Sequence, residues 1–315
     1  MKVLIGAEET AWGGMIQQFR QTLPDVEFIA SAGHAASSLA GFDALIPGMA
    51  YVTETLLNTA DRLQLIQQAG AGLERVDLQA ARQRGIAVAN VPSDSSGNAD
   101  SVAELGIWMM LGLARRSHEI AAAIAGGQLG IPVGMALKGK TVGLVGLGGI
   151  GKALSRRLAG FEMQLIGVKR RADQQFARDH GLAWLGTMDQ LPELLAAADF
   201  VILSLPDNAE THHIIDETAL AQMKTGSFLI NLGRGGLIDK TPFLAALEVG
   251  HLAGAGLDVF WQEPVAADDE LFQYNIIATP HLGGVTDISL AGNVKGVCDN
   301  LRRLRDGEAV QHRWV

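Results

Sequence analysis

Short apolar runs recur along residues 1–97, and stretches with helical spacing of apolar residues lie between them. Because the runs are brief and bounded by turn residues, they predict β-strands. Strands are expected at Val3–Ile5, Val26–Ala30, Ala44–Ile46, Leu63–Gln67 and Ile86–Val88, and helices at Trp12–Leu23 and Leu78–Arg84. Strands that alternate with helices form parallel sheets, so this part of the chain predicts a doubly wound, flavodoxin-like layer structure.

A second series of strands follows a long apolar stretch. Residues Asn98 to Ala125 predict one helix, which Gly126 and Gly127 end. Six strands should come next, the number that a full Rossmann sheet needs. They are expected at Thr141–Val145, Gln164–Val168, Phe200–Leu203, Ser227–Asn231, Gly254–Val259 and Ile276–Ala278. A last helix, Val285–Arg305, is expected to return to the first series.

This order predicts an α/β protein in which one domain is inserted into another. A Rossmann doubly wound parallel sheet over residues 98–284 would interrupt a flavodoxin-like substrate-binding domain made of residues 1–97 and 285–315. The length of 315 residues suits two domains of ordinary size. Two chain crossings, near residues 98 and 284, would then act as hinges.

Composition and charge narrow the class of protein. With 48% hydrophobic and 19% charged residues, the chain can bury a full core. Its net charge of −9 disfavours nucleic acid as a partner. The single cysteine, Cys298, excludes a disulfide framework and a cysteine-based zinc site, and it is expected to be a small buried side chain. No apolar run is long enough to span a bilayer, so we expect a cytoplasmic chain without a membrane partner or a metal.

A glycine turn follows the first strand of the second series. Gly146, Gly148 and Gly151 fit the G-x-G-x-x-G spacing of dinucleotide-binding sites. Gly146 would permit a tight turn, Gly148 would let the backbone approach a pyrophosphate, and Gly151 would let the following helix pack on the strand. The N–H groups at the start of that helix, with Gly149 and Ile150, would face the phosphates. The turn therefore predicts a bound dinucleotide.

The end of the next strand bears on which dinucleotide binds. In such sites an acid about 20 residues beyond the turn grips the ribose 2′-hydroxyl. Lys169, Arg170 and Arg171 stand there, and no acid accompanies them. Cations can pair with a 2′-phosphate, which a carboxylate would repel. The run favours NADP(H), although a solvated basic loop has the same composition and NAD(H) stays possible.

Three polar residues follow late strands of the second series. Arg234 comes after Ser227–Asn231, Glu263 after the strand that ends at Val259, and His281 after Ile276–Ala278. Open α/β sheets place their ligand crevice at the carboxyl ends of the strands. Arginine offers a planar fork to a carboxylate, and an imidazole, with an ordinary pKa of about 6.5, can give or take a proton at neutral pH. A glutamate hydrogen-bonded to an imidazole favours its charged form.

Each of the three residues also has a plain structural explanation. Arg234, among glycines, can cap a loop; Glu263, before Pro264, can be a solvated turn acid; His281 can be a turn residue. The order of motifs decides between these readings, because it resembles that of the D-isomer-specific 2-hydroxyacid dehydrogenases. The resemblance covers nearly the whole chain. It rests on the glycine turn, Asn231-x-x-Arg234-Gly235, Leu257-Asp258-Val259-Phe260-x-x-Glu263-Pro264 and Thr279-Pro280-His281, and in the first domain on Gln68–Asp77, Asn90-Val91-Pro92 and Ala103-Glu104.

The resemblance implies catalytic and substrate-binding roles. His281 would be the acid/base and Glu263 its partner. Arg234 would clamp the substrate carboxylate and polarise its keto oxygen, while the backbone N–H groups of Ala71 and Gly72 hold the other side of that carboxylate. The implied reaction is the reduction of a 2-keto acid, with hydride passing from the nicotinamide to C2.

The resemblance also implies contacts to the cofactor and to a second copy of the chain. Asp258 would meet the nicotinamide carboxamide, and Ser204, Leu205 and Pro206 would lie near the adenosine. Leu232 and His281 are further expected cofactor contacts. The helix Asn98–Ala125 resembles the family's dimerisation region, so a homodimer is expected.

One departure from the family pattern points to a subgroup. Lys169 stands where NAD-dependent members usually carry aspartate, so the chain is similar to the NADPH-dependent glyoxylate/hydroxypyruvate reductases. The alternatives are an NAD-dependent member and a nucleotide-sensing, corepressor-like protein, which would need no proton donor. A formate- or phosphite-oxidising relative would carry glutamine beside the histidine, and Glu263 argues against it.

Overall fold

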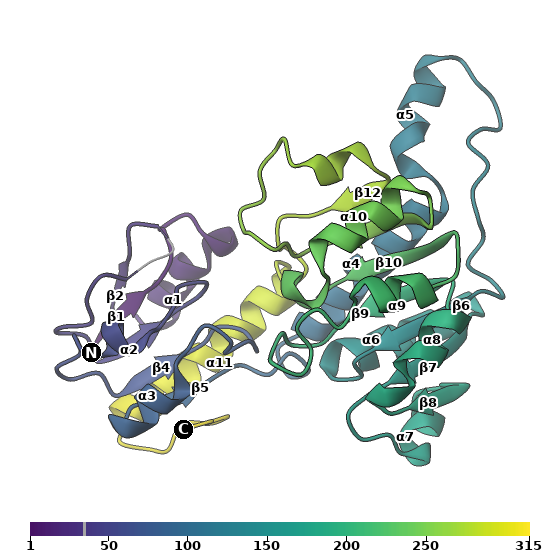
Figure 1. Cartoon of the computed structure of the whole chain (residues 1–315). Helices are drawn as coiled ribbons and strands as arrows, with labels where there is room; N and C mark the ends of the chain where they lie inside the picture. Colours follow the sequence, from purple (N-terminus) through teal and green to yellow (C-terminus); the bar gives the residue numbers. More distant parts are fainter. Residues whose placement is uncertain (34–35) are drawn as a thin grey trace. The chain divides into compact units, whose positions relative to one another are not determined.

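The computed structural model describes residues 1–33 and 36–315, which divide into two compact units. Unit 1 comprises Met1–Asn98 and Gly284–Val315, and unit 2 comprises Ala99–Gly283. In Figure 1 unit 1 runs from purple to blue and ends in yellow, and unit 2 runs from teal to light green. The chain therefore leaves unit 1 after Asn98 and re-enters it at Gly284.

Unit 1 contains a five-stranded parallel sheet with the order β2-β1-β3-β4-β5. Its strands are β1 (Lys2–Ile5), β2 (Glu27–Ala30), β3 (Ala44–Ile46), β4 (Leu65–Gln67) and β5 (Ala87–Ala89), and its helices are α1 (Met15–Thr22), α2 (Glu54–Leu57), α3 (Leu78–Gln83) and α11 (Asp287–Arg305), with a 3-10 turn η1 (Trp12–Gly14). The central strand β3 is buried throughout, as a strand covered on both faces requires. The expected parallel strands are confirmed, and α11 returns to this unit, where Asn300 Nδ2 donates to Gln67 Oε1 at 2.7 Å.

Unit 2 contains a seven-stranded parallel sheet, within the described residues, with the order β12-β11-β10-β9-β6-β7-β8. All six expected strands are present, and a seventh, β8, was not predicted. β8 is three residues long and pairs with β7 alone, at the edge of the sheet. The strands are β6 (Thr141–Val145), β7 (Gln164–Val168), β8 (Trp184–Gly186), β9 (Phe200–Leu203), β10 (Ser227–Asn231), β11 (Leu252–Leu257) and β12 (Ile276–Ala278).

The strand order of unit 2 reverses between β6 and β9. From β6 the chain winds outward to β7 and β8, and from β9 it winds the other way to β12. Helices cover both faces, and two cores result because neighbouring strand residues point to opposite sides: Ile230 joins one core and Leu229 the other. This is the parallel Rossmann-like architecture that the sequence predicts. The covering helices are α6 (Gly149–Leu158), α7 (Gln174–Asp179), α8 (Leu191–Ala197), α9 (Glu217–Gln222) and α10 (Lys240–Glu248), with 3-10 turns η2 (Ala159–Phe161), η3 (Met188–Gln190), η4 (Gly235–Leu237) and η5 (Glu270–Gln273).

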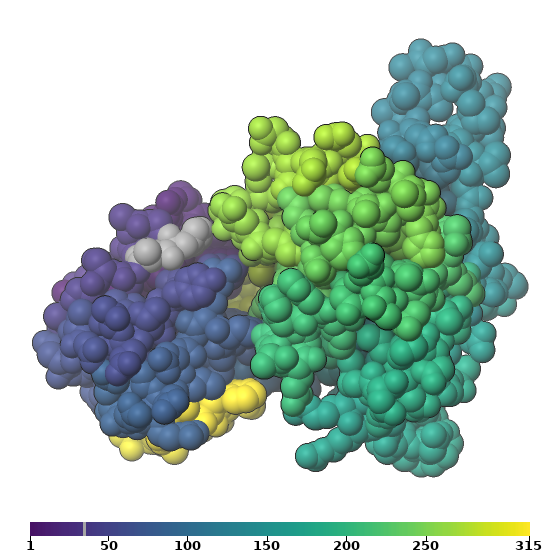
Figure 2. Space-filling model, in the orientation of Figure 1, coloured from purple at the N-terminus to yellow at the C-terminus, as the bar shows by residue number. Residues whose placement is uncertain are grey.

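The single helix expected over Asn98–Ala125 is wrong. Two helices occur, α4 (Asn98–Ala114) and α5 (Ser117–Ala125), and between them Arg116 adopts a left-handed φ of 53°. The carbonyl of Ala114 accepts a hydrogen bond from the N–H of Met135 at 2.7 Å instead of continuing the helical ladder. α5 and the loop after it consequently project from the rest of unit 2 (Figures 1 and 2).

The structure also shows the surroundings of Cys298 and the length and apolar character of the helices. Cys298 on α11 is fully buried in the core of unit 1, as predicted, and burial raises the pKa of its thiol to about 11. Among the described residues, none of the helices has both the length and the apolar character needed to cross a bilayer.

Candidate active site

The glycine turn lies at the carboxyl end of β6, at the point where the strand order reverses. Gly146 has a φ of 95°, and a Cβ there would come within 2.9 Å of the Ser204 carbonyl. A Cβ on Gly151 would lie 2.3 Å from the Gly146 carbonyl, so only glycine lets α6 approach the strand this closely. Around Gly148, by contrast, no atom lies within 4 Å of an added Cβ. The two outer glycines are needed by the fold, and the middle one leaves open space.

The start of α6 suits a bound phosphate. Gly148 is the N-cap residue and has no side chain with which to satisfy the first N–H groups, which belong to Gly149, Ile150 and Gly151. α6 has ten residues, so its dipole adds positive potential at this end. Open space beside Gly148 and unsatisfied N–H groups are the features that a pyrophosphate needs. The residues present therefore fit a dinucleotide.

The loop after β9 contacts the glycine turn from the other side of the reversal point. Ser204 Oγ donates to the Gly146 carbonyl at 2.9 Å, and the Leu205 side chain packs on the Cα of Gly146. Pro206 is exposed just beyond them. Leu232, after β10, is only 4% exposed, and its side chain packs against Gly106 of α4. Three of these residues border the turn, whereas the Leu232 side chain belongs to the core.

The basic run after β7 is anchored on an aromatic ring. Lys169 Nζ lies 3.6 Å from the centroid of the Phe176 ring, on α7, and Lys152 Nζ of α6 lies 6.0 Å from the same centroid. Arg170 and Arg171 are exposed, and Arg170 approaches Glu210 at 3.9 Å. Sequence reasoning missed Lys152 and Phe176, because only the fold brings α6 and α7 together at this ring.

Arg234, Glu263 and His281 follow β10, β11 and β12, which are neighbours in the sheet. The Arg234 backbone carbonyl accepts from Asn231 Nδ2 at 2.8 Å, which fixes the loop to the end of β10. Its neighbour Gly235 lies so close to the backbone of Phe260 that an added Cβ would be 2.2 Å away. The loops of Arg234 and Glu263 are therefore in direct contact.

Glu263 joins two loops through its carboxylate. Oε1 accepts from the N–H of Phe260 at 3.0 Å, and Oε2 lies 2.9 Å from Nδ1 of His281. The two side chains are 16% and 28% exposed, respectively, so the pair is partly shielded from water. A carboxylate only accepts hydrogen bonds, which places the Nδ1 proton between the two groups. The structure thus brings the predicted acid/base residue and its predicted partner together.

Asp258 holds the loop that carries His281. Its carboxylate accepts from the Thr279 hydroxyl at 2.6 Å, from the N–H of Leu282 at 2.8 Å and from the N–H of Gly283 at 3.0 Å. His281 itself adopts a left-handed φ of 54°, and its N–H donates to the Asp258 carbonyl. Burial raises the pKa of Asp258 despite these donors. The sequence did not predict that Asp258 holds this loop, because no local sequence pattern indicates these contacts.

Ala71 and Gly72 lie in unit 1, in the loop after β4. Ala71 is exposed, and its carbonyl accepts from Asn90 Nδ2 at 2.7 Å. The Gly72 carbonyl accepts from Gln68 Nε2 at 3.1 Å. Their expected part in binding a carboxylate is taken up as a proposal below.

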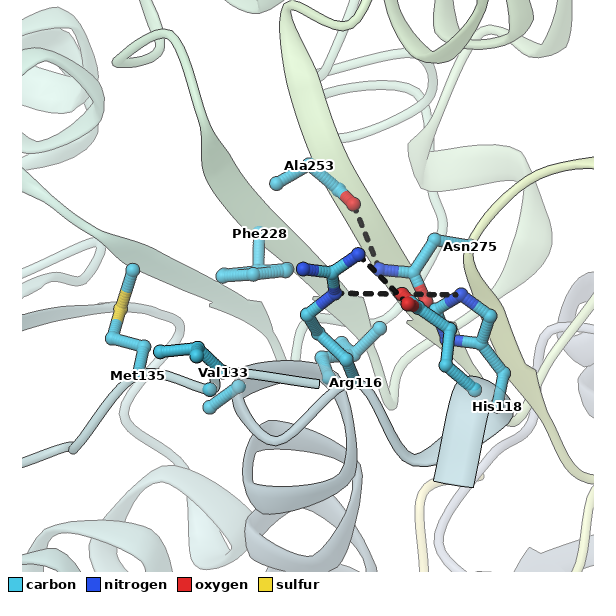
Figure 3. Close-up of a pocket in the computed structure, with 11 residues that line it drawn as sticks. Arg116, His118, Val133, Met135, Phe228, Ala253 and Asn275 are labelled. Carbon is cyan, nitrogen blue, oxygen red and sulfur yellow. Dashed lines mark hydrogen bonds and ion pairs between the residues drawn. The ribbon is translucent and has the colours of Figure 1, made fainter. Parts of the chain in front are cut away.

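A cavity of about 530 Å³ in unit 2 lies elsewhere. Phe228, Ala253 and Asn275, which line it, stand at or before the amino ends of β10, β11 and β12, opposite the ends that precede Arg234, Glu263 and His281. Figure 3 shows Asn275 bonded to the Ala253 carbonyl, and Arg116 and His118 gathered nearby. This cavity belongs to the base of the projecting α5 segment and is separate from the candidate active site.

The glycine turn lies at a Rossmann reversal point, and a glutamate–histidine pair and an arginine follow neighbouring strands of the same sheet. This combination is typical of a nicotinamide-dependent oxidoreductase. Comparison with known sequences agrees. The pattern of the D-isomer specific 2-hydroxyacid dehydrogenase NAD binding domain matches residues 107–283. The chain belongs to the D-isomer-specific 2-hydroxyacid dehydrogenase family.

Individual relatives agree with this membership. The chain is 36% identical over 267 residues to glyoxylate reductase of Thermococcus litoralis, covering 82% of this chain and 78% of that protein. It is 34% identical over 270 residues to glyoxylate/hydroxypyruvate reductase B of Yersinia pestis, covering 82% and 79%. Among solved structures, D-lactate dehydrogenase of Aquifex aeolicus, complexed with NAD and lactic acid, superposes with a TM-score of 0.84 at 25% identity, covering 98% and 96%. The chain spans about half the length, 49%, of a D-3-phosphoglycerate dehydrogenase that it also matches.

Proposed function

We propose that this chain reduces small 2-keto acids of the glyoxylate or hydroxypyruvate type to D-2-hydroxy acids, with NADPH preferred over NADH. The observation that carries the proposal is the Glu263–His281 pair, which lies beside the Arg234 loop at the carboxyl ends of three neighbouring strands. Similarity to glyoxylate and glyoxylate/hydroxypyruvate reductases at 34–36% identity supports the choice of substrate.

The roles that we propose for the catalytic residues come from the family resemblance and are consistent with the contacts in unit 2. The bound nicotinamide supplies the hydride that C2 receives. Because Nδ1 of His281 faces Glu263, the proton that the keto oxygen gains would come from Nε2. The glutamate carboxylate accepts a hydrogen bond from Nδ1 and holds the ring in one orientation. Arg234 would bind the substrate carboxylate and stabilise negative charge on the reacting oxygen, and the N–H groups of Ala71 and Gly72 would bind the same carboxylate from unit 1.

The cofactor residues are assigned by the same reasoning. Gly146, Gly148, Gly149, Ile150 and Gly151 would hold the pyrophosphate at the start of α6. Lys169, Arg170 and Arg171 would pair with the 2′-phosphate of NADP(H), since no acid stands at the end of β7. Ser204, Leu205 and Pro206 would border the adenosine. Leu232, through its backbone, and Asp258 would lie toward the nicotinamide.

The exposed apolar side chains of α5 and of the loop after it support a homodimer that forms through this projecting segment. Ile124, Leu129, Ile131 and Val133 expose between 49% and 97% of their surface on α5 and the loop after it. A projecting segment with this much exposed apolar surface is more stable when a second copy covers it. Leu129→Glu should convert the dimer to a monomer in sedimentation equilibrium, and a monomeric unaltered chain would contradict this part. For the enzyme we propose a cytoplasmic location.

The function is tested by steady-state kinetics with the purified chain. NADPH and NADH are each combined with glyoxylate, hydroxypyruvate, pyruvate and longer 2-keto acids, and kcat/KM is compared across the panel. The proposal predicts the highest values for glyoxylate or hydroxypyruvate with NADPH. Tight cofactor binding without turnover of any acid would favour a nucleotide-sensing protein, and equal kcat/KM values for the two cofactors would remove the NADP(H) preference.

A further inference from the structure

Three consecutive carbonyls in the loop after β4 are each held by a different donor of unit 1. The Gly70 carbonyl accepts from the N–H of Val91 at 3.2 Å, the Ala71 carbonyl from Asn90 Nδ2 at 2.7 Å, and the Gly72 carbonyl from Gln68 Nε2 at 3.1 Å. These three peptide units are trans, so each carbonyl and the N–H of the following residue point in opposite directions. Holding the carbonyls therefore turns the N–H groups of Ala71, Gly72 and Leu73 the other way.

These three N–H groups, called the amide row from here on, donate to no protein acceptor within residues 1–33 and 36–315. Ala71 is exposed, and Gly72 and Leu73 are partly exposed, so the row faces water. Backbone N–H groups that have no protein acceptor and lie close together in a loop can bind an anion, because each carries a partial positive charge.

The two side-chain donors are themselves fixed. Asn90 is 6% exposed, and its backbone lies directly after β5. The Gln68 amide donates to the Gly48 carbonyl as well as to that of Gly72, and its Oε1 accepts from the N–H of Ala69 at 3.0 Å. Each side chain is therefore already held in one conformation, and it can fix the direction of its carbonyl without a further loss of side-chain entropy.

We propose that Gln68 and Asn90 are positioning residues that orient the amide row toward the substrate carboxylate. This inference rests on the proposed function, in which the N–H groups of Ala71 and Gly72 bind the substrate carboxylate, and it adds the residues that hold this loop in place. Neither side chain touches the substrate; each acts through a carbonyl that it holds. Their loss should therefore weaken binding of the carboxylate while the chemistry at His281 continues, so KM rises and kcat changes little.

The test compares three variants of the full chain with saturating NADPH and glyoxylate. Gln68→Met and Asn90→Leu keep the side-chain volume but lose the donor, and each should raise KM by about tenfold or more with the Kd for NADPH unchanged. Gln67→Met is the matched control, since Gln67 is buried next to Gln68 and bonds to Asn300 but holds none of the three carbonyls. It should cost stability without changing KM. Because the two donors act on different carbonyls, either variant carries the test if the other does not fold.

The outcomes separate the two proposals. Turnover by the unaltered chain, with KM unchanged in both donor variants or raised equally in Gln67→Met, would overturn the positioning role alone. A fall in kcat with KM unchanged would also overturn it, because the lesion would then lie in catalysis and not in carboxylate binding. No turnover of any 2-keto acid by the unaltered chain would overturn the proposed function and this inference with it.

Discussion

Glu263 and His281 belong to loops that follow different strands, and their side chains meet with Oε2 at 2.9 Å from Nδ1. The second carboxylate oxygen is held by the N–H of Phe260, so the glutamate cannot turn away without losing a backbone bond. The imidazole is therefore oriented by a charged group that is itself oriented, as an acid/base catalyst requires.

Glu263→Gln should lower kcat for 2-keto acid reduction by at least about tenfold, because the amide no longer offers two acceptor oxygens and so no longer holds the imidazole with its proton on Nδ1. The comparison is made by steady-state kinetics at saturating NADPH. Glu270→Gln, an exposed acid of η5 downstream of Glu263, is the control and should leave kcat unchanged. Equal kcat values in the Glu263 variant and the unaltered chain would contradict the pairing.

Lys169→Asp combined with Arg170→Ala should shift preference toward NADH. Removing two cations and adding an acid at the end of β7 takes away charge-assisted hydrogen bonds to a 2′-phosphate and offers an acceptor to a 2′-hydroxyl. The ratio of kcat/KM for NADPH to that for NADH should fall at least about tenfold. Arg178→Ala, an exposed cation on α7, is the matched control. An unchanged ratio in the double variant would count against the basic run.

Asp258→Asn should destabilise the fold and lower kcat, because Thr279, Leu282 and Gly283 all donate to this carboxylate and an amide nitrogen cannot accept. The pH dependence has a definite sign. Burial raises the folded-state pKa, so the carboxylate's penalty is fully present above that pKa and is relieved as the pH falls. In urea titrations the unaltered chain should gain stability relative to the variant as the pH falls from neutral toward the ordinary aspartate pKa of 3.8. A difference that shrinks over that interval would contradict the burial argument.

Cys298→Ala should remove a loss of stability at alkaline pH. The folded thiol has a pKa of about 11 against an ordinary value of 9.0, so the unfolded chain ionises first as the pH rises. The stability that the thiol contributes is complete below pH 9 and declines toward pH 11, at about 1.4 kcal/mol per pH unit. Denaturant titrations of both proteins at pH 8, 9 and 10 measure it. Parallel curves of unfolding free energy against pH would show that the thiol titrates normally.

The sequence predicts the strands of this fold better than it predicts where a helix is interrupted. Runs such as Phe200–Leu203 are fully buried, and their apolar pattern marks them directly. β8, a three-residue edge strand that pairs with β7 alone, was not predicted, although the apolar run Leu182–Leu185 overlaps it. The break at Arg116 depends on a hydrogen bond from Met135, 19 residues further along the chain, and no local pattern contains that contact.

In the candidate site, too, some residues were predictable from the sequence and others were not. The positions of Arg234, Glu263 and His281 were predictable because each lies within six residues of the end of a strand, and the carboxyl ends of parallel strands share one edge. The side chains that hold the site together were not. Thr279 bonds to Asp258 across 21 residues, and Asn90 reaches Ala71 across 19, so these pairs become visible only in the folded chain.

The central claim is that His281 supplies the proton in an NADPH-dependent reduction of a 2-keto acid. Its most direct test is the rate of NADPH oxidation with saturating glyoxylate by the unaltered chain and by His281→Ala. We predict turnover by the unaltered chain, a kcat lower by about 10²–10⁴-fold in the variant, and the same Kd for NADPH in both. A variant that oxidises NADPH as fast as the unaltered chain would contradict the assignment.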